Sequence, residues 1–120
     1  MNKHTLVLGA SENPSRYSYL AVERLVAKNY SVTAIGRKAG KIGNINIITN
    51  QIEIADLDTV TVYLNAENQK QYYNYILSLN PKRIIFNPGA ENDELETIAK
   101  AKGIEVLNAC TLVLLSVGKY

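Results

Sequence analysis

The sequence predicts an α/β fold: a doubly wound, mainly parallel sheet of five strands with helices on both faces. Short runs rich in apolar and β-branched residues alternate along the chain with stretches of helical periodicity. The first strand, helix and strand fit within about 30 residues, the size of a βαβ unit, and such units cross over with one hand. The length of 120 residues suits one domain, residues 1–120, with a single core.

The first part of the chain contains two strands joined by a helix. Residues 5–8 (TLVL) form an unbroken apolar run, typical of a strand that is buried on both faces. A helical period then places Leu20 and Leu25 on one side, with charged residues bordering them. Residues 31–35 (SVTAI) form a second β-branched run that is ended by a glycine. This is the order expected of a first βαβ unit.

Residues 37–56 are the least regular part of the sequence. Gly40 and Gly43 interrupt a basic stretch, and three isoleucines within 45–48 indicate a short extended piece. The pattern leaves the structure of this segment open.

The second part of the chain repeats the alternation. Residues 59–64 (TVTVYL) have the strongest strand composition in the chain. Residues 69–79 are expected to form a helix, which an Asn-Pro pair stops. The strands at 83–86 and 104–107 flank a helix at 92–102, after which a glycine provides the stop.

Composition argues against several classes of protein. The net charge is only +2, with 13 basic residues spread among 11 acidic ones, so a nucleic-acid-binding face is not expected. The longest apolar run, 112–115, is far too short to span a membrane. The single cysteine, Cys110, excludes an internal disulfide and favours a reducing, cytoplasmic location.

In doubly wound sheets, ligands bind beyond the carboxyl ends of the strands, which directs attention to three loops. The first loop is Gly9-Ala10-Ser11-Glu12-Asn13-Pro14-Ser15-Arg16. Its small residues allow a close backbone approach, and the free N–H groups of the following helix attract phosphate. The alternative is that Asn13 or Ser15 merely caps the helix. Ser11 and Pro14 stand where the dinucleotide fingerprint G-x-G-x-x-G has glycines, so that fingerprint is absent.

The second and third loops add charge and turn chemistry. Arg37, Lys38 and Lys41 follow the second strand, where an NAD-binding fold places an acidic residue. These cations favour a ligand with an additional phosphate, such as NADP or coenzyme A (CoA), although a solvated basic loop is the alternative. In the third loop, Pro88 and Gly89 suit a tight turn. By itself this third loop is an ordinary strand-to-helix connection.

Together these loops resemble the CoA-binding family of small Rossmann-like proteins, related to the CoA-binding domain of the succinyl-CoA synthetase α subunit. The matching segments are LVLGASENPSRYS, AIGRKAGKIG, KRIIFNPGAENDEL and GIEVLNACTLVLL, and they extend over essentially the whole chain. The resemblance implies a Rossmann-like fold and CoA or an acyl-CoA as the cofactor. One departure is Ile35-Gly36-Arg37, where many relatives have Val-Asn-Pro after the second strand. This departure concerns the adenosine end of the site.

The resemblance also implies roles for individual residues. Ser11 and Asn13 donate to the cofactor's phosphates with Arg16 close by, and Lys41 is the favoured basic residue. The cofactor passes the loop after the fourth strand, and a groove edged by Tyr63, Asn65, Pro88 and Ala90 suits its uncharged arm. The candidate cofactor-binding residues are therefore Gly9, Ala10, Ser11, Glu12, Asn13, Pro14, Arg16, Gly36, Arg37, Lys38, Lys41, Tyr63, Asn65, Asn87, Pro88 and Gly89.

No self-contained catalytic set is apparent in the sequence. The only histidine, His4, precedes the first strand and so lies at the end opposite the expected cleft. No metal-ligand spacing is present. The leading hypothesis is a non-catalytic or regulatory module that binds CoA or an acyl-CoA. The alternatives are a small NADP-dependent oxidoreductase, an acyl-CoA-transfer component completed by a partner chain, and an interaction domain without a ligand.

Three further features allow two interpretations each. Cys110 is expected in the core, but at the start of a final helix capped by Asn108 it could form a mixed disulfide with CoA. The tyrosines within 72–75 are expected to pack rather than to stack on adenine. Residues 112–120 are expected either to cover the sheet edge or to form a subunit contact, as in a homodimer.

Overall fold

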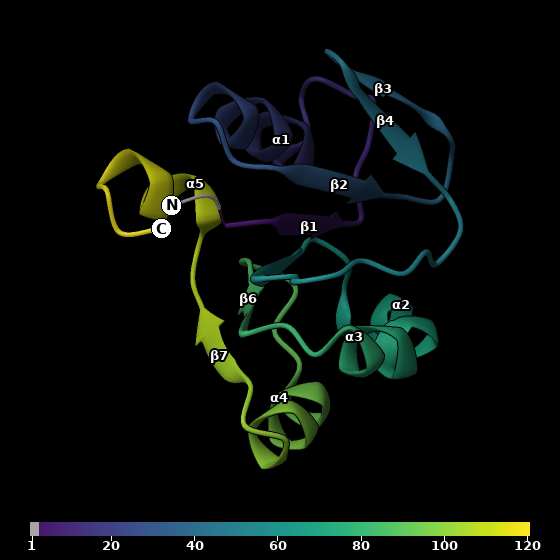
Figure 1. Cartoon of the computed structure of the whole chain (residues 1–120), viewed down its shortest axis with the longest axis vertical. Coiled ribbons are helices and arrows are strands. Elements are labelled where there is room, and N and C mark those ends of the chain that lie inside the picture. Colours follow the sequence, from purple (N-terminus) through teal and green to yellow (C-terminus); the bar gives the residue numbers. More distant parts are fainter. Residues whose placement is uncertain (1–2) are drawn as a thin grey trace.

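The computed structural model describes residues 3–120, which form one seven-stranded sheet flanked by helices (Figure 1). The strands follow the spatial order β3-β4-β2-β1-β5-β6-β7. Their bounds are Thr5–Leu8 (β1), Val32–Ile35 (β2), Gly40–Ile42 (β3), Ile45–Ile48 (β4), Thr59–Val62 (β5), Arg83–Phe86 (β6) and Glu105–Asn108 (β7). The helices are Tyr17–Ala27 (α1), Ala66–Gln69 (α2), Lys70–Tyr72 (η1, a 3₁₀ turn), Tyr73–Leu79 (α3), Asp93–Ala101 (α4) and Thr111–Ser116 (α5). The predicted doubly wound α/β fold is confirmed.

β1 lies at the centre of the sheet and pairs in parallel with both β2 and β5. Leu8 at its carboxyl end lies opposite Ile35 on one side and Val62 on the other. The chain moves outward from β1 to β2 but then crosses to the other side of β1 to begin β5. The strand order therefore reverses between β1 and β5, where the loops that follow these strands separate and leave a crevice.

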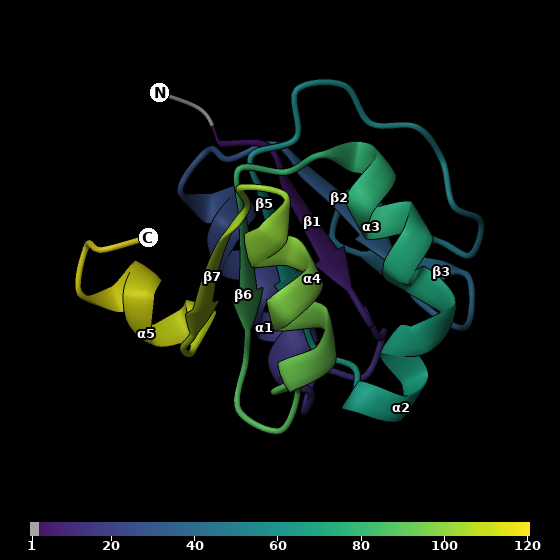
Figure 2. The same cartoon turned by 90° about the horizontal axis from the view of Figure 1, so that it is seen from below.

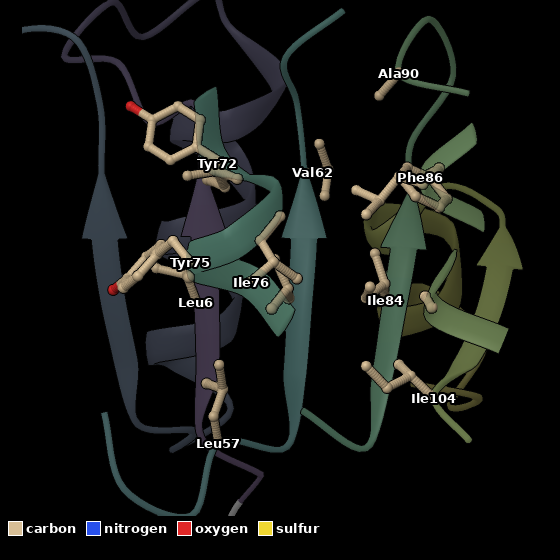
Figure 3. Close-up of a cluster of buried hydrophobic side chains, with 14 of the residues drawn as sticks. Leu6, Leu57, Val62, Tyr72, Tyr75, Ile76, Ile84, Phe86, Ala90 and Ile104 are labelled. Carbon is tan, nitrogen blue, oxygen red and sulfur yellow. The ribbon is translucent and has the colours of Figure 1, made fainter. Parts of the chain in front are cut away.

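Because parallel crossovers share one hand, the two halves of the sheet place their helices on opposite faces. Helices α1 and α5 cover one face, and α3 and α4 cover the other (Figure 2). Alternate residues of β1 serve both layers, with Leu6 and Leu8 facing α3 and α4 and Val7 facing α1. Figure 3 shows the layer beneath α3 and α4, in which Ile76 and Phe86 are fully buried.

The sheet has two more strands than the five predicted, and both come from the segment that the sequence left open. β3 and β4 form an antiparallel hairpin in which Ile42 pairs with Ile45 across a two-residue turn. Gly43 makes that turn with a φ of 58°, and β4 joins the sheet in parallel beside β2. The extended piece expected around 45–48 is β4.

The predicted helix at 69–79 begins earlier and is divided in three. Asn65 caps α2 by accepting a hydrogen bond from the backbone N–H of Asn68 at 2.9 Å. A 3₁₀ turn then joins α2 to α3, which ends at Asn80 in the left-handed conformation. Tyr72 and Tyr75 are buried in the core, as the sequence predicts for this cluster.

The C-terminal segment covers the sheet on the α1 face. Leu115 and Tyr120 belong to the buried layer beneath α1 and α5, so residues 112–120 cover a face of the sheet rather than its edge, and the subunit contact stays a prediction. The N-cap of α5 is Cys110, and the expectation that Asn108 caps this helix is wrong because Asn108 is the last residue of β7. Within residues 3–120, no helix has both the length and the apolar character needed to cross a membrane.

Candidate functional site

A cleft of about 980 Å³ lies at the carboxyl ends of the central strands, where the loops after β1, β2, β5 and β6 meet. This is the position where the strand order reverses. The lining residues are Gly9, Ala10, Ser11, Glu12, Asn13, Arg16, Tyr17, Ser18, Arg37, Lys38, Tyr63, Leu64, Asn65, Asn68, Pro88 and Gly89.

The loop after β1 turns sharply into the cleft because of Gly9. Its φ of 95° is unfavourable for other residues, and a Cβ there would lie 3.1 Å from the Leu64 side chain. The backbone N–H groups of Gly9 and Ala10 both donate to the carbonyl of Ile35, at 2.9 and 3.0 Å. These bonds anchor the start of the loop to the end of β2.

The amino end of α1 presents free backbone donors to this cleft. Arg16 is the N-cap residue and its side chain makes no capping hydrogen bond. Tyr17 and Ser18 in the first turn have no backbone hydrogen-bond partner for their N–H groups, as geometry dictates for the start of a helix. The positive end of the helix dipole adds to the attraction that these donors have for an anion.

The two residues that could have capped α1 bond locally instead. The Asn13 carboxamide oxygen accepts from the backbone N–H of Ser15 at 3.0 Å and from its hydroxyl at 2.8 Å. The Ser11 hydroxyl accepts from the Asn13 N–H at 3.1 Å. Neither Asn13 nor Ser15 caps the helix, so the capping alternative raised by the sequence is not the one observed.

Three cations and one carboxylate line the cleft. Arg16, Arg37 and Lys38 are exposed, and none of them forms an ion pair with any residue in 3–120. The carboxylate of Glu12 is turned toward β3, where it accepts the backbone N–H of Lys41 at 3.0 Å. The lining side chains therefore carry a net positive charge, which favours a polyanionic ligand.

Two glycines let the loops after β1 and β2 come together. A Cβ on Gly36 would lie 2.3 Å from the carbonyl oxygen of Ala10, closer than any carbon can approach. A Cβ on Gly40 would lie 2.4 Å from the Glu12 side chain. Gly36 therefore shapes the floor of the cleft without lining it.

The ends of β5 and β6 carry a buried polar network that does not itself line the cleft. The Asn87 amide donates to the Thr61 hydroxyl at 2.7 Å and to the Val62 carbonyl at 2.9 Å. Its oxygen accepts the backbone N–H of Thr111 at 2.8 Å. Asn87 thus ties β5 and β6 to the start of α5, and it is only 2% exposed.

Most of the predicted site residues lie together in the cleft, but four do not line it. Pro14 is exposed outside it, Gly36 and Asn87 are buried beneath it, and the exposed Lys41 lies on β3. Ala90, expected at the edge of the groove, is buried in the core. Sequence reasoning missed four lining residues, namely Tyr17, Ser18, Leu64 and Asn68. The first two follow from the rule that the first turn of a helix carries its free donors.

The other titratable candidates lie outside the cleft. His4 is at the opposite end of the sheet, where its Nε2 is 2.8 Å from the Thr33 hydroxyl and burial lowers its pKa. Cys110 is a half-buried free thiol that does not line the cleft. The described residues contain no group of three or more His, Cys, Asp or Glu side chains placed to hold a metal ion.

Comparison with known proteins identifies the family. The family described as "CoA binding domain" matches residues 3–116. A solved structure titled "Crystal structure of uncharacterized protein" is 50% identical, with a TM-score of 0.97 over 100% of this chain and 99% of that one. No curated protein matches the sequence.

More distant structures share the fold. A Thermus thermophilus structure is 21% identical, with a TM-score of 0.83 over 99% of this chain and 91% of that one. The dinucleotide-forming acetyl-coenzyme A synthetase 1 of Ca. Korarchaeum cryptofilum, solved with phosphate and ADP, is 18% identical, with a TM-score of 0.71. That likeness covers 89% of this chain but 25% of the synthetase. On the strength of the family match and the 50% identical structure, the chain belongs to the CoA binding domain family.

Proposed function

We propose that the chain binds CoA or an acyl-CoA in the cleft and acts as a non-catalytic or regulatory module. The observation that carries this proposal is the uncapped amino end of α1, which opens into a cleft lined by three cations that form no ion pair within residues 3–120. Membership of the CoA binding domain family supports the same ligand. The function proposed is binding, because the lining residues contain no nucleophile with an adjacent base among the described contacts.

The two halves of CoA match two sides of the cleft. CoA carries a pyrophosphate and a ribose phosphate at one end and a long uncharged arm at the other. Arg37 and Lys38 follow β2, and the residues that carry the free N–H groups of α1 line the same cleft. Tyr63, Leu64 and Pro88 line the part that follows β5 and β6 and bring no charge. We assign the phosphates to the first side and the arm to the second.

The expected affinity is modest and depends on salt. Each charge-assisted hydrogen bond contributes roughly 1.5–3 kcal/mol, so three contribute about 5–9 kcal/mol before other costs. Association itself costs at least ~4 kcal/mol, although burial of the arm offsets part of this. The balance corresponds to a Kd in the micromolar range or weaker. Because the cations are exposed, added salt weakens binding.

Isothermal titration calorimetry with CoA at low and at high salt tests the phosphate-centred site. We expect a micromolar or weaker Kd that rises with salt, and an unchanged Kd would contradict this model. A thermal-shift panel of CoA, acetyl-CoA, NADP and ATP tests ligand choice, since a ligand that binds the native state raises Tm. A rise selective for CoA and acetyl-CoA supports the proposal, whereas a rise selective for NADP contradicts it.

Incubation with acetyl-CoA tests the non-catalytic part of the proposal. We expect the thioester to be recovered unchanged, as measured by chromatography against a protein-free control. Thioester loss that depends on the protein would indicate an enzyme instead.

A further inference from the structure

Gln69 is a fully buried polar residue that joins two loops of the cleft. It is the last residue of α2 and is 0% exposed. Its side-chain Nε2 donates to the carbonyl of Leu64 at 2.8 Å and to the carbonyl of Ala90 at 2.7 Å. Leu64 follows β5 and Ala90 follows β6, and these strands are neighbours in the sheet (Figure 3 labels Ala90). One amide group therefore connects the loops that follow two adjacent strands.

The orientation of the Gln69 carboxamide is fixed by its partners. Carbonyl oxygens can only accept hydrogen bonds, so both amide hydrogens point to the two loops. No backbone N–H of residues 3–120 donates to the carbonyl of Leu64 or Ala90. The Gln69 oxygen accepts from the side-chain amide of Asn92 at 2.9 Å, and the Asn92 oxygen accepts the backbone N–H of Leu95 and caps α4. A buried network whose groups are all paired holds one arrangement of the chain.

The two segments that Gln69 connects provide one side of the cleft. The lining residues of these segments are Leu64, Asn65, Asn68, Pro88 and Gly89. The Leu64 side chain also lies close to the start of the loop after β1, where a Cβ on Gly9 would be 3.1 Å from it. Gln69 itself does not line the cleft. It therefore acts on the cleft only through the backbone of the two loops.

We infer that Gln69 is a positioning residue, which holds the loops after β5 and β6 at the separation that accepts the uncharged arm of the ligand. This role rests on the proposed function, because it concerns the side of the cleft assigned to the arm. Without the Gln69 amide the two loops adopt other separations, and the ligand has to order them when it binds. The loop on the phosphate side is held separately, by the bonds from Gly9 and Ala10 to Ile35.

Gln69→Met tests this role, because methionine has a similar length but no amide. The controls are Tyr75→Phe and Tyr75→Ala. Tyr75 is on α3 and is 8% exposed, and its hydroxyl donates at 2.6 Å to the carbonyl of Ile52, which does not line the cleft. One control removes a hydrogen bond and the other a buried ring, so their losses of stability bracket the loss expected for Gln69→Met.

Two measurements are made on each folded, full-length variant. Calorimetry gives the Kd for CoA and for adenosine 3′,5′-bisphosphate, which has phosphates but no arm. Urea denaturation gives the stability without ligand. The comparison of the two ligands separates an effect on the arm side from an effect on the whole cleft.

We expect Gln69→Met to bind CoA about three- to tenfold more weakly than wild type. A loss of this size corresponds to the native loop separation in about a tenth to a third of the variant molecules. The affinity for adenosine 3′,5′-bisphosphate stays within about twofold of wild type, because that ligand does not reach between these loops. Both Tyr75 variants lose stability but keep both affinities within about twofold. A purely structural role of Gln69 would not produce this difference between the two ligands.

Hydrogen exchange of the wild-type protein tests the same role without a substitution, and it decides the matter if Gln69→Met does not fold. The Nε2 hydrogens of Gln69 exchange when their bonds to the loops open. A ligand that binds only the closed arrangement suppresses this opening by a factor of 1 + [L]/Kd. NMR should therefore show roughly tenfold slower exchange when CoA is present at about ten times its Kd. Adenosine 3′,5′-bisphosphate at the same saturation should change the rate by less than about twofold.

Several results would contradict this role of Gln69. Wild-type affinity of folded Gln69→Met for CoA would show that the loop separation does not affect the arm. Equal losses for CoA and the bisphosphate, or equal slowing of exchange by both, would show that the network supports the whole cleft. The same loss of CoA affinity in Tyr75→Ala would trace the effect to stability alone. If wild type binds neither ligand, the proposed function itself fails, whereas the other results leave CoA binding by the wild type intact.

Discussion

Gly36 is the residue at which two loops of the cleft come into contact. Its Cα faces the carbonyl oxygen of Ala10, with no room for a side chain between them. A methyl group there would push against the backbone of the loop that also carries Ser11 and Glu12. Gly36 thus controls the position of the proposed phosphate-binding loop from beneath, although it does not line the cleft.

We expect Gly36→Ala to lower the free energy of unfolding by about 1–3 kcal/mol, the usual cost of overpacking, and to weaken CoA binding. Gly43→Ala is the control. A Cβ on Gly43 meets open space at the hairpin turn, but its φ of 58° makes alanine unfavourable by about 1–2 kcal/mol. Both variants lose stability in urea denaturation, and only Gly36→Ala loses affinity in calorimetry. Equal CoA affinities of the two variants would show that Gly36 does not control the shape of the cleft.

His4 gives a second prediction at the scale of one residue. Burial lowers its pKa in the folded protein, whereas the unfolded chain takes up the proton near pH 6.5. Acidification below that pH therefore stabilises the unfolded state, and the folded protein loses stability. His4→Gln can keep a hydrogen bond to Thr33 but does not titrate.

We expect the wild type to lose more stability than His4→Gln between pH 8 and pH 5.5. Urea denaturation of both proteins at the two pH values gives the difference, in which the contributions of all carboxyl groups cancel. Parallel stability curves would show that His4 is equally easy to protonate in the folded and unfolded states.

The elements of the fold differ in how far the sequence determines them. β1, β5 and β6 are fully buried, and their continuous apolar or β-branched runs identify them from composition alone. The β3–β4 hairpin could not be predicted in the same way, because Gly40 and Gly43 look like breaks in the chain. Gly43 in fact makes the hairpin turn, and Gly40 leaves space for a side chain from another loop. The need for a glycine at position 40 comes from a contact with a distant loop, which the local sequence does not show.

The candidate site shows the same division. Sequence position alone brings the loops after β1, β2, β5 and β6 to one edge, because parallel strands all end there. It does not show which way each side chain turns. Asn87 follows β6 as predicted but points into the interior, and Lys41 belongs to a hairpin strand that the sequence did not reveal.

The cations of the loop after β2 and the cation of β3 are expected to differ in their effect on CoA affinity. Arg37 and Lys38 line the cleft, and Lys41, the residue favoured by family resemblance, does not. We expect Arg37→Gln and Lys38→Gln each to weaken CoA binding about five- to tenfold, which is less than a buried charge-assisted bond contributes, because both side chains are exposed. Lys41→Gln changes affinity by less than about twofold, because salt screens its distant charge.

Calorimetry at constant ionic strength measures all three variants. An Arg37→Gln/Lys38→Gln double variant also shows a flatter dependence of affinity on salt than wild type. A loss in Lys41→Gln equal to that in Arg37→Gln would place a phosphate of the ligand over β3.

At the scale of the whole molecule, one end of the sheet carries the cleft and the other carries packing contacts that stabilise the fold. The cleft occupies the carboxyl end of the strands, and Tyr120 closes the amino end. The Tyr120 ring lies 5.1 Å from that of Tyr30, edge to face, and under the Arg83 guanidinium at 4.4 Å. Its hydroxyl bonds to that of Thr5, and its carbonyl accepts from Lys3 at 2.6 Å. These contacts hold Lys3 and Thr5 next to Tyr120 at the amino end of the strands.

This separation predicts that stability can be changed at the amino end without changing the site. Tyr120→Ala removes a ring that is 7% exposed, and we expect it to lower the free energy of unfolding by about 3 kcal/mol, the lower end of the range for buried aromatic residues. Tyr120→Phe keeps the ring and loses the bond to Thr5, at a cost of about 1 kcal/mol. Urea denaturation measures both. Calorimetry with CoA should give the wild-type Kd for each variant under conditions where it is folded, because β1 and β5 remain paired between Tyr120 and the cleft. A fall in affinity that follows the loss of stability would mean that the amino end of the sheet also determines the shape of the cleft.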